Sequence, residues 1–213
     1  MKNLKTILGA ATLATLLATG TQAQIVNSAH DFSSYSWSGG EICKPCHTPH
    51  FANASAGALW NHALTNANYT LFDGSAGTTA DFDRVSRLCM SCHDGTVALD
   101  SFGGTTGTNL IPGSARIGTD LQDDHPIGKE AVYPTAGNTR FRAATLSGTS
   151  YQIPGPNATD SKLRLQAWVD SGGATQQVVG CSTCHQVHNA GNFGNMLRFS
   201  NTGSNLCLAC HIK

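Results

Sequence analysis

The pattern of apolar and polar positions is most regular between residues 162 and 179. Apolar Leu163, Leu165, Ala167 and Val169 alternate there with Lys162, Arg164, Gln166 and Trp168. This period of two predicts a half-buried strand rather than a helix. A pair of glycines follows, and Gln176–Val179 is then the expected hairpin partner, while the segment from Arg140 to Tyr151 is a second hairpin candidate.

The longest apolar run lies at the start of the chain, where it is typical of a signal peptide. Two lysines precede a run of apolar and small residues from Ile7 to Gly20, and Thr21–Ala23 fits a cleavage site. We therefore expect residues 1–23 to be removed and the exported chain to begin at Gln24. No later run is long and apolar enough to predict a transmembrane helix.

The composition from Gln24 onward is poor in residues that build a hydrophobic core. Val, Ile, Leu and Phe account for 36 of these residues, about 19%, which is low for a packed domain. The whole chain has 13 basic and 13 acidic side chains, so it lacks the basic excess of a nucleic-acid-binding protein. Disorder usually combines low hydrophobicity with strong net charge, and we therefore expect a bound group to fill the interior.

All eight cysteines lie in one repeated pattern, C-x-x-C-H, which occurs four times and is the attachment signature of c-type haem. Two thiols at this spacing can form thioethers to one porphyrin edge, and the following imidazole binds the iron as proximal ligand. The predicted attachment residues are Cys43, Cys46, Cys89, Cys92, Cys181, Cys184, Cys207 and Cys210. The predicted proximal ligands are His47, His93, His185 and His211.

Three other uses of paired cysteines are considered. An exported chain with eight cysteines could form four disulfides, two zinc sites of four cysteines each, or redox-active C-x-x-C pairs. None of these requires a histidine after each second cysteine, whereas haem attachment does. The sequence therefore predicts four covalently bound c-type haems.

Five further histidines are candidates for the second axial position of the irons: His30, His50, His62, His125 and His188. Methionine cannot be the general distal ligand, because Met1 lies in the predicted signal peptide and Met90 lies inside an attachment motif. Ligation of every iron by two histidines is the economical solution, and it leaves one of the five histidines over. Their identities as ligands do not follow from the count alone.

Spacing restricts the pairing of two of these histidines. His50 follows His47 by three residues, and His188 follows His185 by three, so each pair shares one face of a helical turn. Such neighbours cannot hold one flat ring from opposite sides. His50 and His188 are therefore expected to reach other haems, and the nearest for His188 is the haem of the last motif.

The motifs divide the chain into four parts. Their starts are separated by 46, 92 and 26 residues. We expect a signal peptide at 1–23, an N-terminal dihaem region at 24–100, a haem-free insertion of loops and β-hairpins at 101–180, and a C-terminal dihaem region at 181–213. The insertion serves either as surface covering or as a brace between the two haem pairs.

Several segments resemble multihaem c-type cytochromes with doubled C-x-x-C-H motifs from metal-reducing bacteria. They are EICKPCHTPH at 41–50, LWNH at 59–62, LCMSCHDGTV at 88–97, DHPI at 124–127, and the closing run from Cys181 to Lys213. The haem count and length resemble extracellular tetrahaem cytochromes of the OmcE type, which polymerise into conductive filaments. The resemblance implies a mostly irregular fold with short helices at the motifs, few short strands or hairpins, and a haem stack as the core.

The resemblance also implies a partner. In such filaments a histidine of one protomer completes the coordination of a haem in the next. The matching residue is His50, which would serve the haem of Cys181 and Cys184 in a neighbouring copy. Other expected partners are further cytochromes or extracellular electron acceptors.

The resulting hypothesis is an exported electron-transfer protein rather than an enzyme. Electrons pass along closely packed haems, and the protein sets their spacing and potential. The filament subunit at the cell surface has two alternatives, a soluble periplasmic electron shuttle and a small multihaem reductase acting on a nitrogen oxide. A reductase needs an iron with one open face, and five spare histidines for four irons argue against such a vacancy.

Overall fold

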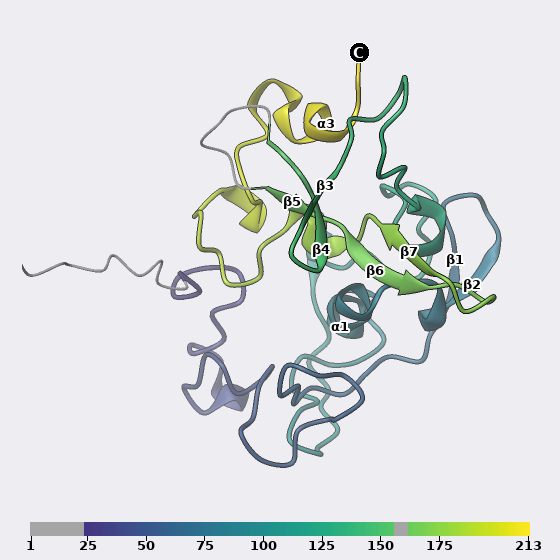
Figure 1. Cartoon of the computed structure of the whole chain (residues 1–213). Helices are drawn as coiled ribbons and strands as arrows, with labels where there is room; N and C mark the ends of the chain where they lie inside the picture. Colours follow the sequence, from purple (N-terminus) through teal and green to yellow (C-terminus); the bar gives the residue numbers. More distant parts are fainter. Residues whose placement is uncertain (1–23, 156–161) are drawn as a thin grey trace, which may run out of the picture.

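The computed structural model describes residues 24–155 and 162–213 (Figure 1). The predicted signal peptide, residues 1–23, lies outside the described residues. The α-helices are α1 (Arg84–His93), α2 (Cys181–Cys184) and α3 (Asn205–Cys210). The strands are β1 (Asn68–Thr70), β2 (Ala76–Thr78), β3 (Thr145–Ser147), β4 (Ser150–Ile153), β5 (Leu163–Arg164), β6 (Gln166–Val169) and β7 (Thr175–Val178). Single 3-10 turns occur at Ser36–Ser38, Thr79–Asp81, Gly113–Ala115, Gly128–Ala131, Gly194–Met196 and Thr202–Ser204.

The strands form small antiparallel sheets. β1 pairs with β2, β4 lies between β3 and β5, and β6 pairs with β7. The predicted hairpin after residue 162 is confirmed, because Gln166 lies opposite Val178 and Val169 opposite Thr175. The second candidate is confirmed over a shorter range, since the β3–β4 hairpin begins at Thr145 rather than at Arg140.

The strand predicted from 163 to 169 is divided between two sheets. Leu163 and Leu165 are buried, as the alternation predicts, whereas Ala167 and Val169 are exposed. The backbone N–H of Leu165 donates to the carbonyl of Tyr151 on β4, and the next residue begins pairing with β7. The prediction is wrong for Ala167 and Val169 because the change of sheet alters which face is covered.

Helix α1 begins and ends at residues suited to those positions. Asp83 caps its start, and its carboxylate accepts the backbone N–H groups of Val85 and Ser86. After His93 and Asp94 the chain turns at Gly95, whose φ of 76° favours glycine. The helix therefore presents the second C-x-x-C-H unit on its last turns.

Apolar side chains gather in three separate clusters rather than one core. Six residues form the largest cluster, which joins the insertion to the C-terminal region: Tyr133, Ile153, Leu163, Leu165, Phe199 and Ala209. A second cluster surrounds α1: Tyr69, Leu71, Phe82, Met90 and Leu121. The third is small and contains Ala56, Trp60 and Leu88. The largest cluster packs the insertion against the C-terminal region, and the choice between a brace for both haem pairs and a surface covering stays a prediction.

Candidate haem-attachment sites

The four C-x-x-C-H units, named here the first to fourth motifs in chain order, are held by short helical segments. The second, third and fourth motifs lie in or at the end of α1, α2 and α3. The first is a hydrogen-bonded turn, in which the N–H groups of Cys46 and His47 both donate to the carbonyl of Cys43. Helical turns were expected at all four motifs, and the first motif forms only this single turn.

Sulfur atoms of successive motifs are close to one another. The interaction between the thiols of Cys89 and Cys181 raises the pKa of Cys89 and lowers that of Cys181. Burial, with a smaller contribution from the charge of Cys46, raises the pKa of Cys92 to about 12. Each of these two interactions joins consecutive motifs.

The third and fourth motifs are joined in the same way. Burial raises the pKa of Cys184 to about 11, with a further contribution from nearby Cys210. The motifs therefore form one continuous series in chain order. The second and third motifs lie 92 residues apart in the sequence but are neighbours in the fold, because α1 packs on α2. All eight thiols are free of disulfides.

Three of the proximal imidazoles are oriented by backbone carbonyls. The Nδ1–H of His47 donates to Ala58 at 2.7 Å, and that of His93 donates to Ala115 at 2.7 Å. The Nδ1–H of His185 donates to Asn195 at 2.9 Å. A hydrogen bond at Nδ1 fixes the tautomer and leaves Nε2 as the nitrogen that binds a metal.

The structure brings three of the spare histidines opposite proximal ones. Ring centroids are 6.0 Å apart for His30 and His93, 6.3 Å for His188 and His47, and 6.5 Å for His125 and His211. Two imidazoles that bind one ion from opposite sides, each through a nitrogen about 2 Å away, have centroids about 6 Å apart. These pairs therefore fit the second, first and fourth motifs respectively.

The position of His188 differs from the expectation that it serves the fourth motif. Its ring lies beside His47 of the first motif. The loop after the third motif runs toward the start of the described chain, where Asn189 donates its side-chain N–H to the carbonyl of Gln24. His188 is thus carried to the N-terminal region, and spacing along the chain does not predict this.

The third motif is the exception in this series. Among the described residues, no imidazole lies opposite His185 at a comparable separation. His62 is buried, and both its nitrogens lie close to carbonyl oxygens, at 2.8 Å from Ala63 and 2.9 Å from Ala98. His50 is exposed, and its recorded hydrogen bonds involve only its backbone.

The residues present fit c-type haem on three counts. Three of the four proximal histidines offer Nε2 while Nδ1 is engaged, and three have a second imidazole at the separation that an iron between them requires. The third count is His30, because burial, with a contribution from His93, lowers its pKa to about 4. A neutral imidazole is the form that binds a metal.

In three motifs a side chain donates a hydrogen bond to the backbone carbonyl of the residue that follows the first cysteine. The Asn61 amide donates to the Lys44 carbonyl at 2.6 Å. In the third motif the Nε–H of Arg198 donates to Ser182, and in the fourth the Nε–H of Arg142 donates to Leu208, both at 2.9 Å. In the second motif the equivalent carbonyl, that of Met90, accepts the backbone N–H of Asp94 instead.

The insertion also contacts the fourth proximal ligand. The Phe141 ring lies 4.9 Å from the His211 ring, and the backbones of these two residues form an isolated bridge. The backbone N–H of Arg142 donates to Cys210, and that of Ile212 donates to Arg140. The segment around Phe141 therefore positions the fourth motif.

Sequence reasoning missed the residues that orient these sites: Asp83, Asn61, Arg142 and Arg198. Asp83 had a local signal, since an aspartate directly before a helical pattern is a typical cap. The other three contact carbonyls across 16 to 66 residues of sequence, and no local pattern indicates such contacts.

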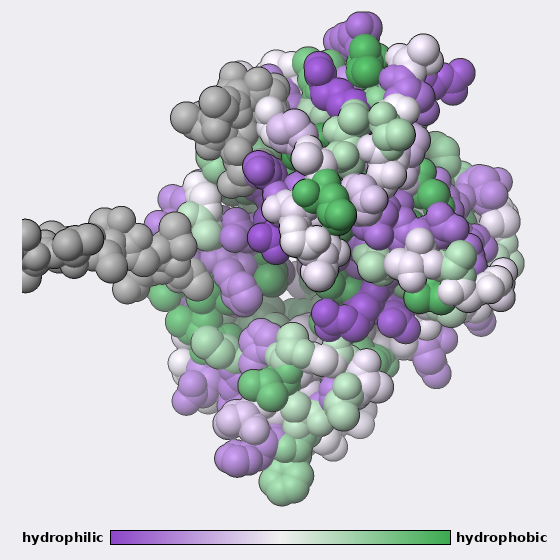
Figure 2. Space-filling view, in the orientation of Figure 1, coloured by the Kyte–Doolittle hydropathy of each residue, from purple (hydrophilic) through white to green (hydrophobic). Residues whose placement is uncertain are grey.

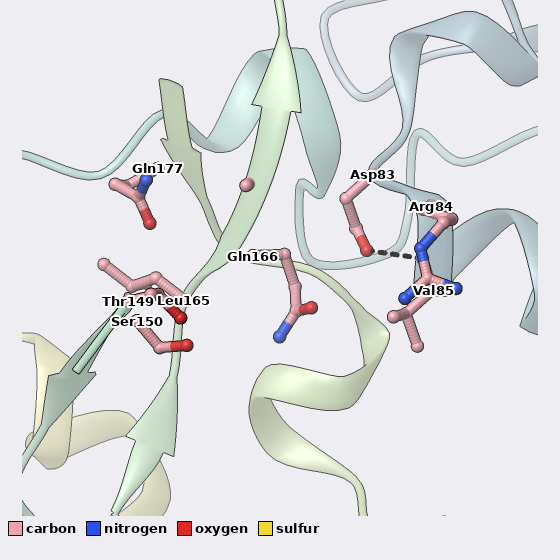
Figure 3. Close-up of a pocket in the computed structure, with 9 residues that line it drawn as sticks. Asp83, Arg84, Val85, Thr149, Ser150, Leu165, Gln166 and Gln177 are labelled. Atoms are coloured by element: carbon pink, nitrogen blue, oxygen red, sulfur yellow. Dashed lines mark hydrogen bonds between the residues drawn. The ribbon is translucent and has the colours of Figure 1, made fainter. Parts of the chain in front are cut away.

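The surface shows where the motifs are accessible. Cys43 and Cys207 are exposed, while the remaining cysteines are partly buried. In the orientation of Figure 1, the molecular surface is hollowed near its centre (Figure 2). A separate pocket of about 220 Å³ lies between the start of α1 and strands β4, β6 and β7, and no motif residue lines it (Figure 3). No helix within 24–155 and 162–213 has the length and apolar character needed to cross a membrane.

Comparison with known proteins supports haem attachment at the end of the chain. Residues 174–213, which contain the third and fourth motifs, match the family described as the doubled CXXCH motif. A search of curated proteins returned no match to the chain. Together with the motifs, the family match indicates a multihaem c-type cytochrome that binds haem covalently and takes part in electron transfer.

Proposed function

We propose that this protein is an exported tetrahaem electron carrier that polymerises through a shared haem ligand. One observation carries the proposal: His47, His93 and His211 each have a second imidazole within the chain, whereas His185 has none at that separation among the described residues. A second copy that supplies the missing ligand would complete the series. The protein would then act outside the cell, because residues 1–23 are expected to direct its export.

Each bound haem would supply an iron that cycles between the ferric and ferrous states. The eight cysteines would hold the porphyrins, and the carbonyls of Ala58, Ala115 and Asn195 orient three of the four proximal imidazoles. The thiols of consecutive motifs influence one another's pKa, which fits closely spaced sites. Two imidazoles at an iron exclude other ligands, and this favours electron transfer over substrate chemistry.

His50 is the residue best placed to act on another copy. It is exposed, and the adjacent Phe51 side chain is fully exposed. The backbone of Phe51 has a φ of 60°, a left-handed conformation that a bulky residue rarely adopts. This segment thus presents an imidazole and a phenyl ring to solvent, which suits insertion at the third motif of a neighbour.

A His50→Ala variant tests the shared ligand. In the haem-loaded protein, about a quarter of the haem should change from low-spin to high-spin, because one iron of four loses an axial imidazole. Polymers should shorten or disappear in electron micrographs. Added imidazole should restore the low-spin spectrum without restoring the polymers, because the free ligand fills the iron but does not join two chains.

Two results would contradict the proposal. A His50→Ala protein with a fully low-spin spectrum would show that His50 is not a ligand, and His62 would then be the candidate at His185. Native material that stays monomeric at high concentration would instead favour the soluble periplasmic shuttle. Carbon monoxide bound by the reduced, unmodified protein would reveal an open iron and favour the reductase.

A further inference from the structure

Two buried carboxylates lie at the opposite ends of α1, the helix that carries the second motif. Asp83 is 1% exposed and Asp94 is 4% exposed. Asp83 accepts N–H groups from Val85 and Ser86 and the hydroxyl of Ser86. Asp94 accepts the hydroxyl of Tyr69 and both the N–H and the hydroxyl of Thr96. All these partners are neutral donors, and the carboxylate oxygens are the acceptors.

Asp83 also lies at the junction of the second and third motifs. Figure 3 shows its side chain directed at the first turn of α1, with the hydrogen bond to Val85 drawn. Its partner Ser86 accepts the backbone N–H of Cys181 through Oγ at 2.9 Å. A Cβ atom on Gly180 would lie only 2.2 Å from Asp83 Oδ2, so the carboxylate occupies the space beside α2. Its charge reaches both Cys89 and Cys181.

The side chains that cap the other motifs are neutral or positively charged. The first motif is capped by the neutral amide of Asn61, whereas guanidinium groups cap the third and fourth motifs. Among the described residues, neither Asp83 nor Asp94 forms an ion pair with a lysine or arginine. Asp83 and Asp94 are therefore held by hydrogen bonds without an ion pair, while Arg84 and Arg87 lie on the same helix and Arg116 packs against Gly95.

These charges bear on the ease with which an iron gains an electron. A nearby anion stabilises the more positive ferric form and a nearby cation destabilises it, and both effects are stronger where water is excluded. Burial and local charge are among the features by which a protein sets a haem potential. The carboxylates at α1 oppose reduction, and the guanidinium groups of Arg198 and Arg142 favour it.

We propose that Asp94 and Asp83 together make the second haem the lowest in potential, that Arg198 offsets the charge of Asp83 at the third motif, and that Arg142 raises the fourth. The internal gradient would then favour electron movement from α1 toward the C-terminal motifs. This inference rests on the proposed tetrahaem electron carrier. Asp83 and Asp94 ligate no iron. They would act on the haem potential through their electrostatic effect alone.

The test is a redox titration of the haem-loaded full chain, followed by optical and electron paramagnetic resonance spectra. Asp83→Asn and Asp94→Asn should each shift the lowest midpoint potential upward, while haem content and low-spin spectra stay unchanged. Arg142→Gln should shift the highest midpoint downward. The matched control is Asp170→Asn at the β6–β7 turn, where the carboxylate also accepts two backbone N–H groups and one side-chain donor. This control should leave all midpoints in place.

The outcomes separate this inference from the proposed function. Four low-spin haems with midpoints unmoved by both aspartate variants would overturn the gradient and leave the electron carrier intact. A protein with fewer than four haems would overturn the carrier itself. If Asp83→Asn fails to fold because the α1 cap is altered, Asp94→Asn alone decides, since its carboxylate lies at the other end of the helix.

Discussion

The first and fourth motifs are anchored in contrasting ways. The first is a single turn beside a small cluster of Ala56, Trp60 and Leu88. The fourth ends helix α3, and Ala209 within it belongs to the largest apolar cluster of the chain. A covalent thioether needs little surrounding protein, so the first site can be thinly packed. The N-terminal site is therefore held by less packing than the C-terminal site, which we expect to be the more rigidly anchored.

The strongest test of this contrast removes packing from the C-terminal cluster. Leu163 is fully buried between β4 and the last motifs, so Leu163→Ala should lower the free energy of unfolding by about 2–5 kcal/mol. Val169→Ala is the matched control, because its side chain is 59% exposed, and it should change stability by less than about 0.5 kcal/mol. Denaturant unfolding of the haem-loaded chain measures both. Equal effects of the two variants would contradict the rigid anchoring of this region.

The sequence predicts local features of this structure better than distant ones. The β6–β7 hairpin follows from alternation around the glycine pair, and the haem sites follow from a five-residue motif. The approach of His188 to His47 does not follow, because it depends on how a loop of irregular residues folds back across the molecule. The hydrogen bond from Cys181 to Ser86 likewise joins residues 95 positions apart, and no period in the chain indicates it.

A smaller effect is expected from the side chains that cap the motifs. Arg142→Ala removes a charged donor from Leu208 at an exposed position and should cost about 1.5 kcal/mol, whereas Asn61→Ala removes a neutral donor from Lys44 and should cost about 0.5–1 kcal/mol. Unfolding in denaturant gives both values. Arg142→Lys serves as a control, since it keeps the charge but lacks the Nε–H, and should restore only part of the loss. A larger cost for Asn61→Ala would reverse the proposed contrast between the two regions.

The smallest effect on stability is expected at the exposed N-terminal segment. Phe51 is fully exposed, so Phe51→Ser removes no buried contact and should change the free energy of unfolding by less than about 0.5 kcal/mol. Its effect should instead appear in self-association, because a phenyl ring beside His50 would bury apolar surface only against a second copy. Sedimentation at increasing protein concentration measures this loss.

Leu146→Ser provides the control for that experiment. Leu146 on β3 is 59% exposed, so the substitution removes a comparable exposed apolar side chain from the region that packs against the fourth motif. If polymers depend on the segment at His50, Phe51→Ser should weaken them and Leu146→Ser should not. Equal weakening by both would mean that general surface hydrophobicity drives association. In that case the thin packing around the first motif would reflect only the strength of its covalent attachment, with no role in joining copies.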